Sequence, residues 1–145
     1  MTVLRLEQIG IVVRDLTAAK VFFIELGLEL EGEATVGGGA VDRINGIEGV
    51  QADIAVMRTP DGHGKVELIK WQTPSALDGD QRTPPNTPGL RHIMFSVDDI
   101  EDVLGRLRPH GAELVGELVR YEDSYRLAYI RGPEGIIIEL AEKIT

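Results

Sequence analysis

Two stretches of this 145-residue chain match each other without a gap: residues 6–33, LEQIGIVVRDLTAAKVFFIELGLELEGE, and residues 90–117, LRHIMFSVDDIEDVLGRLRPHGAELVGE. At a constant offset of 84 residues, 9 of the 28 aligned positions are identical. A match of this length within one chain indicates that a structural unit has been duplicated. The rest of the sequence can therefore be divided by this repeat.

Each copy of the repeat begins as a strand and continues as a helix. Residues 6–13 and 90–97 alternate and are rich in β-branched side chains, which is typical of strands. Asp15 and Asp99 stand where a helix N-cap belongs, and Gly27 and Gly111 suit the left-handed position that ends a helix. We therefore expect one helix directly after the first strand of each copy.

Three further strands complete each unit, at residues 28–36, 50–57 and 65–71 in the first and at residues 114–119, 125–130 and 136–141 in the second. The turn sequences PDG (60–62) and PEG (133–135) precede the last strand of each unit. The sequence thus predicts an α+β protein in which the order βαβββ occurs twice.

The two modules are expected to form a single domain. The first module covers about residues 4–71 and the second about residues 90–142. Residues 72–89 contain four prolines and are predicted to be an extended linker. The glycine-rich insertion at residues 37–49 is predicted to be a mobile loop.

Composition argues against several classes of partner. The net charge of −9 repels phosphate backbones and anionic lipid headgroups, so we expect neither nucleic acid nor membrane partners. No apolar run approaches the roughly 18 residues needed to cross a bilayer, and the first residues lack a signal-peptide pattern, so we expect a cytoplasmic protein. Cysteine is absent, so any metal must be held by His, carboxylate or amide groups.

Four polar side chains occupy related places in the two units. Strand alternation places Gln8 and His92, which are equivalent in the repeat, on the face turned away from the helix. Glu67 and Glu139 lie inside the otherwise apolar closing strands, where an unpaired carboxylate is costly. If the units curve together, these donors can converge on one divalent cation of the Zn, Ni, Co or Mn class. Alternatively, each residue lines a wet groove or pairs with an arginine, namely Arg43, Arg58 or Arg126.

Aromatic residues lie near these four positions. Trp71 shares the parity of Glu67 along the strand and is predicted to form an apolar wall. The second unit carries a group of side-chain types that bind anionic or planar ligands, although packing at the edge of the core explains them equally well: Tyr121, Tyr125, Arg126 and Tyr129. We expect Trp71, Tyr125 and Arg126 to contact a small-molecule substrate.

The chain resembles the vicinal oxygen chelate superfamily, which includes glyoxalase I, methylmalonyl-CoA epimerase, fosfomycin and bleomycin resistance proteins, and extradiol dioxygenases. The resemblance rests on LEQIGIVV (6–13) and LRHIMFSV (90–97) for the opening strands, and on PDGHGKVEL (60–68) and GPEGIIIEL (132–140) for the closing ones. It implies paired βαβββ modules that form a U-shaped half-barrel, assembly as a homodimer, and a metal in the cleft.

The same resemblance implies a metal site and an activity. The four metal-ligand positions of the family fall on Gln8, Glu67, His92 and Glu139. This set is similar to that of one glyoxalase I branch, in which the last Glu leaves the metal and moves a substrate proton. The implied function is a metal-dependent lyase or isomerase that acts through an enediolate on a small oxygenated substrate. Apolar neighbours of Glu139 favour this proton-transfer role because they disfavour the free anion.

Departures from the family pattern limit the choice of substrate. Members that use glutathione thioesters have an Arg and an Asn where this chain has Val12 and Trp71, so lactoylglutathione is not the expected substrate. Ring-cleaving dioxygenases need two His and one carboxylate, whereas Gln8 occupies the place of one His. Two alternatives stay open: an isomerase like methylmalonyl-CoA epimerase, and a non-catalytic, bleomycin-resistance-like protein that binds a planar ligand.

Overall fold

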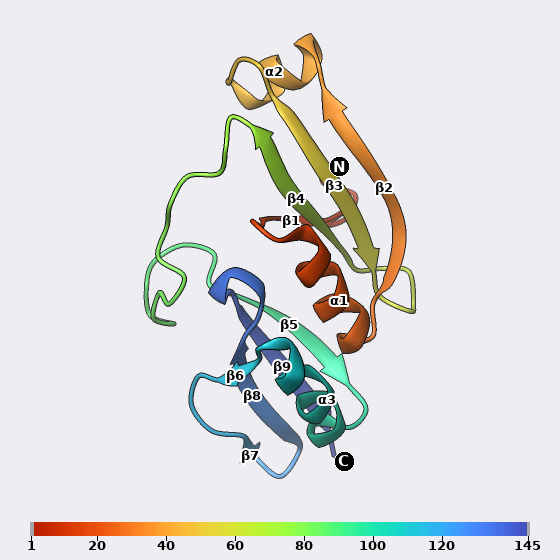
Figure 1. Cartoon of the computed structure of the whole chain (residues 1–145). Helices are drawn as coiled ribbons and strands as arrows, with labels where there is room; N and C mark the ends of the chain where they lie inside the picture. Colours follow the sequence, from red (N-terminus) through yellow and green to blue (C-terminus); the bar gives the residue numbers. More distant parts are fainter. Residues whose placement is uncertain (1, 145) are drawn as a thin grey trace. The chain divides into compact units, whose positions relative to one another are not determined.

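The computed structural model describes residues 2–144, which fall into two compact units, one ending at Asp78 and the other beginning at Gly79. The first unit contains the elements β1 (Ile9–Val12), α1 (Leu16–Leu26), β2 (Glu29–Gly37), α2 (Gly39–Asn45), β3 (Gln51–Arg58) and β4 (Lys65–Thr73). Its strands form one sheet in the order β1-β4-β3-β2, in which β1 is parallel to β4 and the other pairs are antiparallel (Figure 1).

The second unit repeats this topology. Its elements are β5 (His92–Val97), α3 (Ile100–Leu107), η1 (Arg108–His110), β6 (Glu113–Leu114), β7 (Val119–Tyr121), β8 (Tyr125–Arg131), η2 (Pro133–Gly135) and β9 (Ile137–Lys143). The sheet order is β5-β9-β8-β6, and β7 also pairs with β8. The predicted strand at residues 114–119 is divided into two short strands, with Gly116 in the interruption. The paired βαβββ order of an α+β fold is confirmed.

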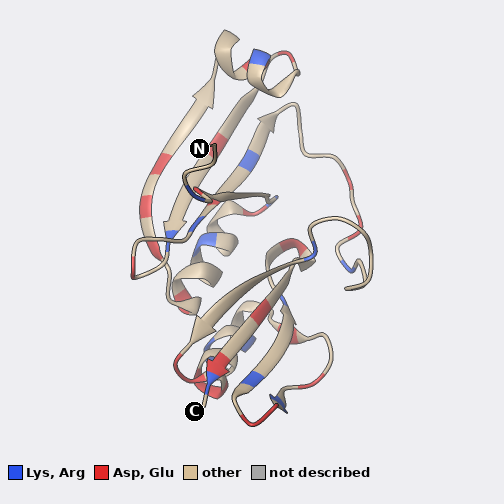
Figure 2. Cartoon of the chain, turned by 180° about the vertical axis from the view of Figure 1, so that it is seen from behind, with Lys and Arg blue, Asp and Glu red and all other residues tan. Residues whose placement is uncertain are grey.

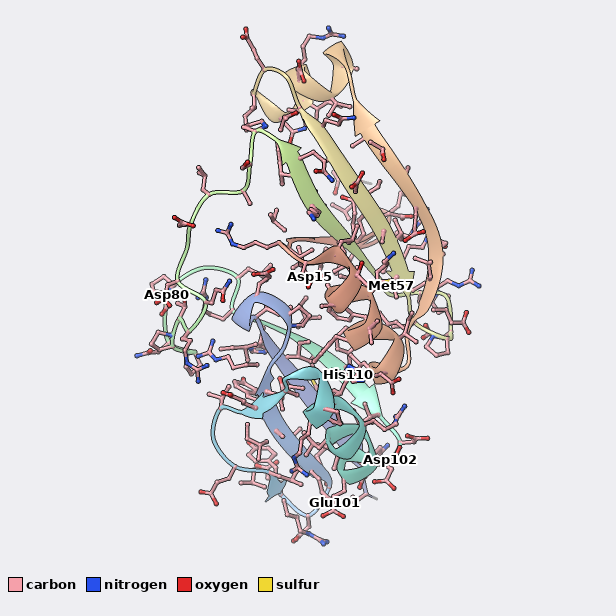
Figure 3. All side chains as sticks on the ribbon, in the orientation of Figure 1. Asp15, Met57, Asp80, Glu101, Asp102 and His110 are labelled. Atoms are coloured by element: carbon pink, nitrogen blue, oxygen red, sulfur yellow. The ribbon has the colours of Figure 1, made fainter. Side chains whose placement is uncertain are left out.

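Both predicted helix starts are confirmed. The carboxylate of Asp15 accepts a hydrogen bond from the Ala18 amide (3.0 Å), and that of Asp99 accepts one from the Asp102 amide (3.1 Å). Figure 3 shows Asp15 at the beginning of α1. α1 ends at Leu26, and the next residue, Gly27, caps it with a φ of 121°, which glycine adopts readily. α3 ends at Leu107, and a short 3₁₀ turn then leads to Gly111.

One face of each sheet packs against its helix and forms the core. In the first unit, α1 buries Phe22 and Phe23, and the sheet buries Leu68 and Met57. The second core is equivalent and consists of Ile100, Val103, Leu104, Leu107, Ile130, Ile138 and Leu140. Residues between these positions along each strand point to the other side, which we call the helix-free face.

The insertion at residues 37–49 was predicted to be a mobile loop, and the structure corrects this. It contains α2, and the carboxylate of Asp42 accepts hydrogen bonds from the amides of Gly49 (2.9 Å) and Val50 (2.8 Å). These bonds connect the helix to the start of β3, so the glycine-rich segment has a defined structure.

Figure 2 shows acidic positions spread over both units rather than gathered on one element. Within residues 2–144, no helix has the length and apolar character required to cross a membrane.

Candidate functional site

In the first unit, Gln8 directly precedes β1, and Glu67 lies on the neighbouring strand β4. Gly10 of β1 pairs in parallel register with Glu67 of β4. Gln8 precedes Gly10 by two residues, and alternation along the extended chain places it on the same helix-free face. Glu67 is half-buried and has no hydrogen bond or ion pair within the part of the chain that the structure describes. A carboxylate in this condition is available to bind a cation.

Two of the arginines that could have paired with these carboxylates are bound elsewhere. Arg58 lies 3.2 Å from the carboxylate of Glu29. Arg126 donates a hydrogen bond of 2.9 Å to Glu101, and this bond raises the pKa of the Arg126 guanidinium. Neither arginine therefore accounts for Glu67 or Glu139.

In the second unit, His92 and Glu139 lie in contact. The Nε2 atom of His92 is 3.3 Å from Oε1 of Glu139, whose side chain is 13% exposed. Glu139 pairs in parallel register with Met94 and in antiparallel register with Tyr129. The rings of His92 and Tyr129 have their centroids 4.9 Å apart, with a tilt of 38°. An imidazole, a carboxylate and a phenol ring thus form one cluster.

The separation of His92 and Glu139 fits two ligands of one metal ion. Two donors that each lie about 2.1 Å from an ion are about 3.0 to 3.4 Å apart when the angle between them is 90° to 109°. The observed 3.3 Å falls in this range. The donor set of imidazole and carboxylate also suits a divalent transition metal.

The two pairs occupy the same position in the repeat. Gly10 and Met94, which pair with Glu67 and Glu139, are related by the same offset of 84 residues as Gln8 and His92. Gly10 and Glu67 therefore have the strand register of Met94 and Glu139, and His92, two residues before Met94, contacts Glu139.

The structure describes these residues as two pairs, one in each unit. Within residues 2–144, no group of three or more His, Asp or Glu side chains is placed to hold a metal ion. A site made of all four residues is therefore a proposal and is argued below.

Trp71 and Val12 lie on the helix-free face of the first sheet. Val12 pairs in register with Ile69, which lies two residues after Glu67 on β4, and Trp71 follows two residues later. Val12 is 48% exposed and Trp71 is half-buried. The surface beside Glu67 is thus apolar.

Tyr125 and Arg126 lie on opposite faces of the second sheet, although both were predicted to contact substrate. Tyr125 shares the face of Tyr129 and Glu139, since alternate residues of β8 point to one side. Arg126 is on the other side, where it binds Glu101 of α3, labelled in Figure 3. The structure therefore does not bring Arg126 together with His92 and Glu139.

Tyr129 is a member of the cluster that the sequence placed in the aromatic group but did not single out as a substrate contact. It lies four residues after Tyr125 on the same strand, and residues at this spacing share a face. The spacing of the two tyrosines was the signal in the sequence that could have identified it.

A separate hollow of about 480 Å³ lies near α2 in the first unit and includes none of the predicted site residues. Thr35, Gly38, Asp42 and Thr73 are among the residues that line it. The oxygens of Asp42 bind the amides of Gly49 and Val50, so this carboxylate has a structural role.

Comparisons with known proteins agree with this fold. The chain is 28% identical over 140 residues to the uncharacterized protein YaeR of Escherichia coli strain K12, and the match covers 96% of each chain. It is 29% identical over 142 residues to the uncharacterized protein YwbC of Bacillus subtilis strain 168, over 96% of this chain and 98% of that protein.

Solved structures extend the similarity. A glyoxalase family protein from Bacillus cereus superposes with a TM-score of 0.96 at 47% identity, over 100% of this chain and 97% of that chain. TnmS3, an antibiotic binding protein from Streptomyces sp. CB03234, has a TM-score of 0.63 at 18% identity over 99% of each chain, which shows a shared fold. The family model matches residues 5–140. The chain therefore belongs to the Glyoxalase/Bleomycin resistance protein/Dioxygenase superfamily.

Proposed function

We propose that this protein is a metal-dependent lyase or isomerase that moves a proton between adjacent carbons of a small oxygenated substrate. Gln8, Glu67, His92 and Glu139 would together hold one divalent cation, and Glu139 would also carry the proton. The observation that supports this best is the 3.3 Å contact between His92 and Glu139, on strands whose register is repeated at Gln8 and Glu67.

A bound cation of the Zn, Ni, Co or Mn class would supply positive charge that stabilises negative charge developing on two adjacent substrate oxygens. Gln8 contributes a neutral amide oxygen, and Glu67 contributes a carboxylate that has no partner among residues 2–144. His92 contributes Nε2, which faces Glu139.

Glu139 is suited to hold and release a proton at its carboxylate oxygens. Its neighbours on the same face of β9 are Ile137 and Ala141, which are 3% and 2% exposed. These residues limit access of water, and exclusion of water strengthens charge interactions and reduces loss of the proton to solvent. Ile138 and Leu140 point to the core, so the apolar surround expected from the sequence comes from Ile137 and Ala141 rather than from these two residues.

The walls beside the two pairs favour an apolar or planar substrate. Val12 and Trp71 offer no charged handle for a peptide, and Tyr125 is 38% exposed on the face of Glu139. These side chains support a small carbon skeleton with adjacent oxygens rather than a glutathione conjugate.

We also propose that the protein is a homodimer. Leu6 and Leu90 stand at equivalent repeat positions, two residues before Gln8 and His92, and they are 75% and 72% exposed. Large apolar side chains exposed at paired positions are typical of surfaces that are covered by another chain.

A second function is a binding protein without catalysis. Tyr121 and Tyr125 are cross-strand partners and are 51% and 38% exposed, so they could stack on a planar ligand with no metal present. Metal content separates the two functions, because the catalytic function requires a bound cation.

Elemental analysis of protein purified without added metal tests the proposal. We expect about one divalent transition metal per chain, lost for the most part in His92→Ala and Glu67→Ala while circular dichroism stays that of the wild type. His63→Ala and Glu48→Ala, which alter the same residue types elsewhere, should keep the metal. Wild-type metal content in both site variants would show that the assignment is wrong.

A further inference from the structure

Tyr129 has a specific relationship to both members of the second pair. It lies opposite Glu139 in the antiparallel register of β8 and β9. Its ring lies 4.9 Å from that of His92 at a tilt of 38°. Tyr129 therefore borders the imidazole whose Nε2 atom approaches Glu139 at 3.3 Å.

The first unit lacks an equivalent ring. There the residue opposite Glu67 in the β3–β4 register is Val56. The two units thus have the same strand pairing but differ at the position next to the carboxylate, where one has an aliphatic side chain and the other a phenol. This difference accompanies the difference between Gln8 and His92 at the equivalent ligand positions.

A histidine ligand binds a metal through one ring nitrogen, so the plane of its ring matters. The terminal torsion of a histidine side chain is broad, so an unsupported ring samples more than one plane, and each plane directs Nε2 differently. His92 is 38% exposed, so only part of its surface is covered by packing. A ring packed against the imidazole reduces this freedom, as neighbouring groups do for histidine ligands in general.

We propose that Tyr129 is a positioning residue: its ring holds the imidazole of His92 in the plane that directs Nε2 toward Glu139. This orientation would direct Nε2 toward the proposed metal, and in that respect the inference rests on the proposed function. The orientation itself is a property of the chain without metal and can be measured separately.

Tyr129→Val, which places the Val56 side chain type in the second unit, tests the inference by NMR of the metal-free protein. The chain has three histidines, and His92→Gln identifies which ring signals belong to His92. We expect Tyr129→Val to shift and narrow the His92 ring signals toward those of a mobile, exposed histidine, whereas Tyr129→Phe should retain wild-type signals because it keeps the ring. If Tyr129→Val does not fold, Tyr129→Leu replaces it in the same experiment.

Tyr125→Val is the matched control, since Tyr125 lies on the same strand and face but opposite Lys143. It should leave the His92 signals unchanged. The inference is overturned if Tyr129→Val and Tyr129→Leu both leave the His92 signals unchanged, or if Tyr129→Phe alters them as much as Tyr129→Val does.

Titration with Co²⁺, followed by visible absorption, connects the inference to the proposed function. We expect Tyr129→Val to weaken Co²⁺ binding by about 10- to 100-fold, the usual effect of losing a group that orients a ligand, and Tyr129→Phe to bind nearly as well as the wild type. Wild-type protein that binds no Co²⁺ would contradict the proposed function and leave the NMR result to decide the role of Tyr129.

Discussion

Glu67 and Glu139 occupy the same register position in their two units, since each pairs with the residue two places after a predicted ligand. Their surroundings differ. Glu139 contacts His92, whereas Glu67 has no charged partner in the described range 2–144. One duplicated carboxylate position is therefore expected to serve two roles, fixed ligand and proton carrier.

Isosteric substitution should separate these roles. With a substrate identified, Glu139→Gln is expected to lower turnover by about 10² or more while retaining much of the metal, because the amide keeps an oxygen donor but cannot carry the proton. Glu67→Ala, which removes the oxygen donor, should instead lose metal. Turnover and metal content are measured on the same samples. Wild-type turnover of Glu139→Gln, or wild-type solvent-deuterium exchange at the substrate carbon, would assign proton transfer to another residue.

Light scattering at micromolar concentration should give twice the mass of the chain. A cluster of exposed apolar residues near the start of the chain, Val3, Leu4 and Leu6, favours contact with a second copy. Leu6→Asp and Leu90→Asp are expected to weaken the dimer, because each would place a charge in the interface. A monomeric mass for the wild type would refute this prediction.

The glycines of the two repeat turns should differ in their tolerance of alanine. Gly62 and Gly135 have similar positive φ values, 79° and 75°, so alanine should cost about 1 to 2 kcal/mol at either position. A Cβ at Gly62 meets nothing within 4 Å, whereas a Cβ at Gly135 would lie 1.5 Å from the carbonyl oxygen of Gln81. The free energy of unfolding of Gly135→Ala, measured by urea denaturation, should therefore be about 1 to 3 kcal/mol lower than that of Gly62→Ala. Equal losses would show that the contact with Gln81 is unimportant.

Asp53 should make stability depend on acid pH. Its carboxylate accepts hydrogen bonds from Thr35 (2.7 Å) and Gln72 (2.5 Å), which hold its pKa below the ordinary value. The folded chain thus binds this proton more weakly than the unfolded chain, so the stabilisation is present above about pH 4 and is lost as the pH falls through the lowered pKa.

Urea denaturation of wild type and Asp53→Asn at about pH 5 and about pH 3 measures this effect. The wild type should lose more stability than the variant between the two pH values. Thr35→Val, which removes the largest cause of the shift, should reduce the loss in part. Identical pH profiles for all three proteins would contradict the assignment.

Local signals in the sequence predicted the fold well because they act over a few residues. Asp15 and Asp99 form N-caps through a side chain that reaches an amide three residues away. The insertion at 37–49 was harder to predict, because its order depends on Asp42 reaching residues 49 and 50. Glycine content alone carries no information about such a bond.

The candidate site could be predicted only as residues that share a face. Alternation correctly placed Glu139 and His92 on one side of the sheet, and the structure adds their contact. Proximity in sequence was misleading for Arg126, because adjacent residues on a strand point in opposite directions and Tyr125 takes the other face. The contact between Tyr129 and His92 joins strands that are far apart in the sequence. Local sequence patterns do not predict how close two such side chains lie.

The packing of Gln81 on Gly135 has a consequence for how such duplicated genes can recombine. Residues before β5 belong to the second unit: the Gln81 amide donates to Glu134, and Arg82 pairs with Glu113. A crossover that joins the first repeat of one relative to the second repeat of another preserves these contacts when it falls ahead of Gly79. A crossover just before β5 would combine the Gly135 turn of one parent with the Gln81 segment of the other. The segment that can be exchanged without loss of these contacts is therefore longer than the repeat itself.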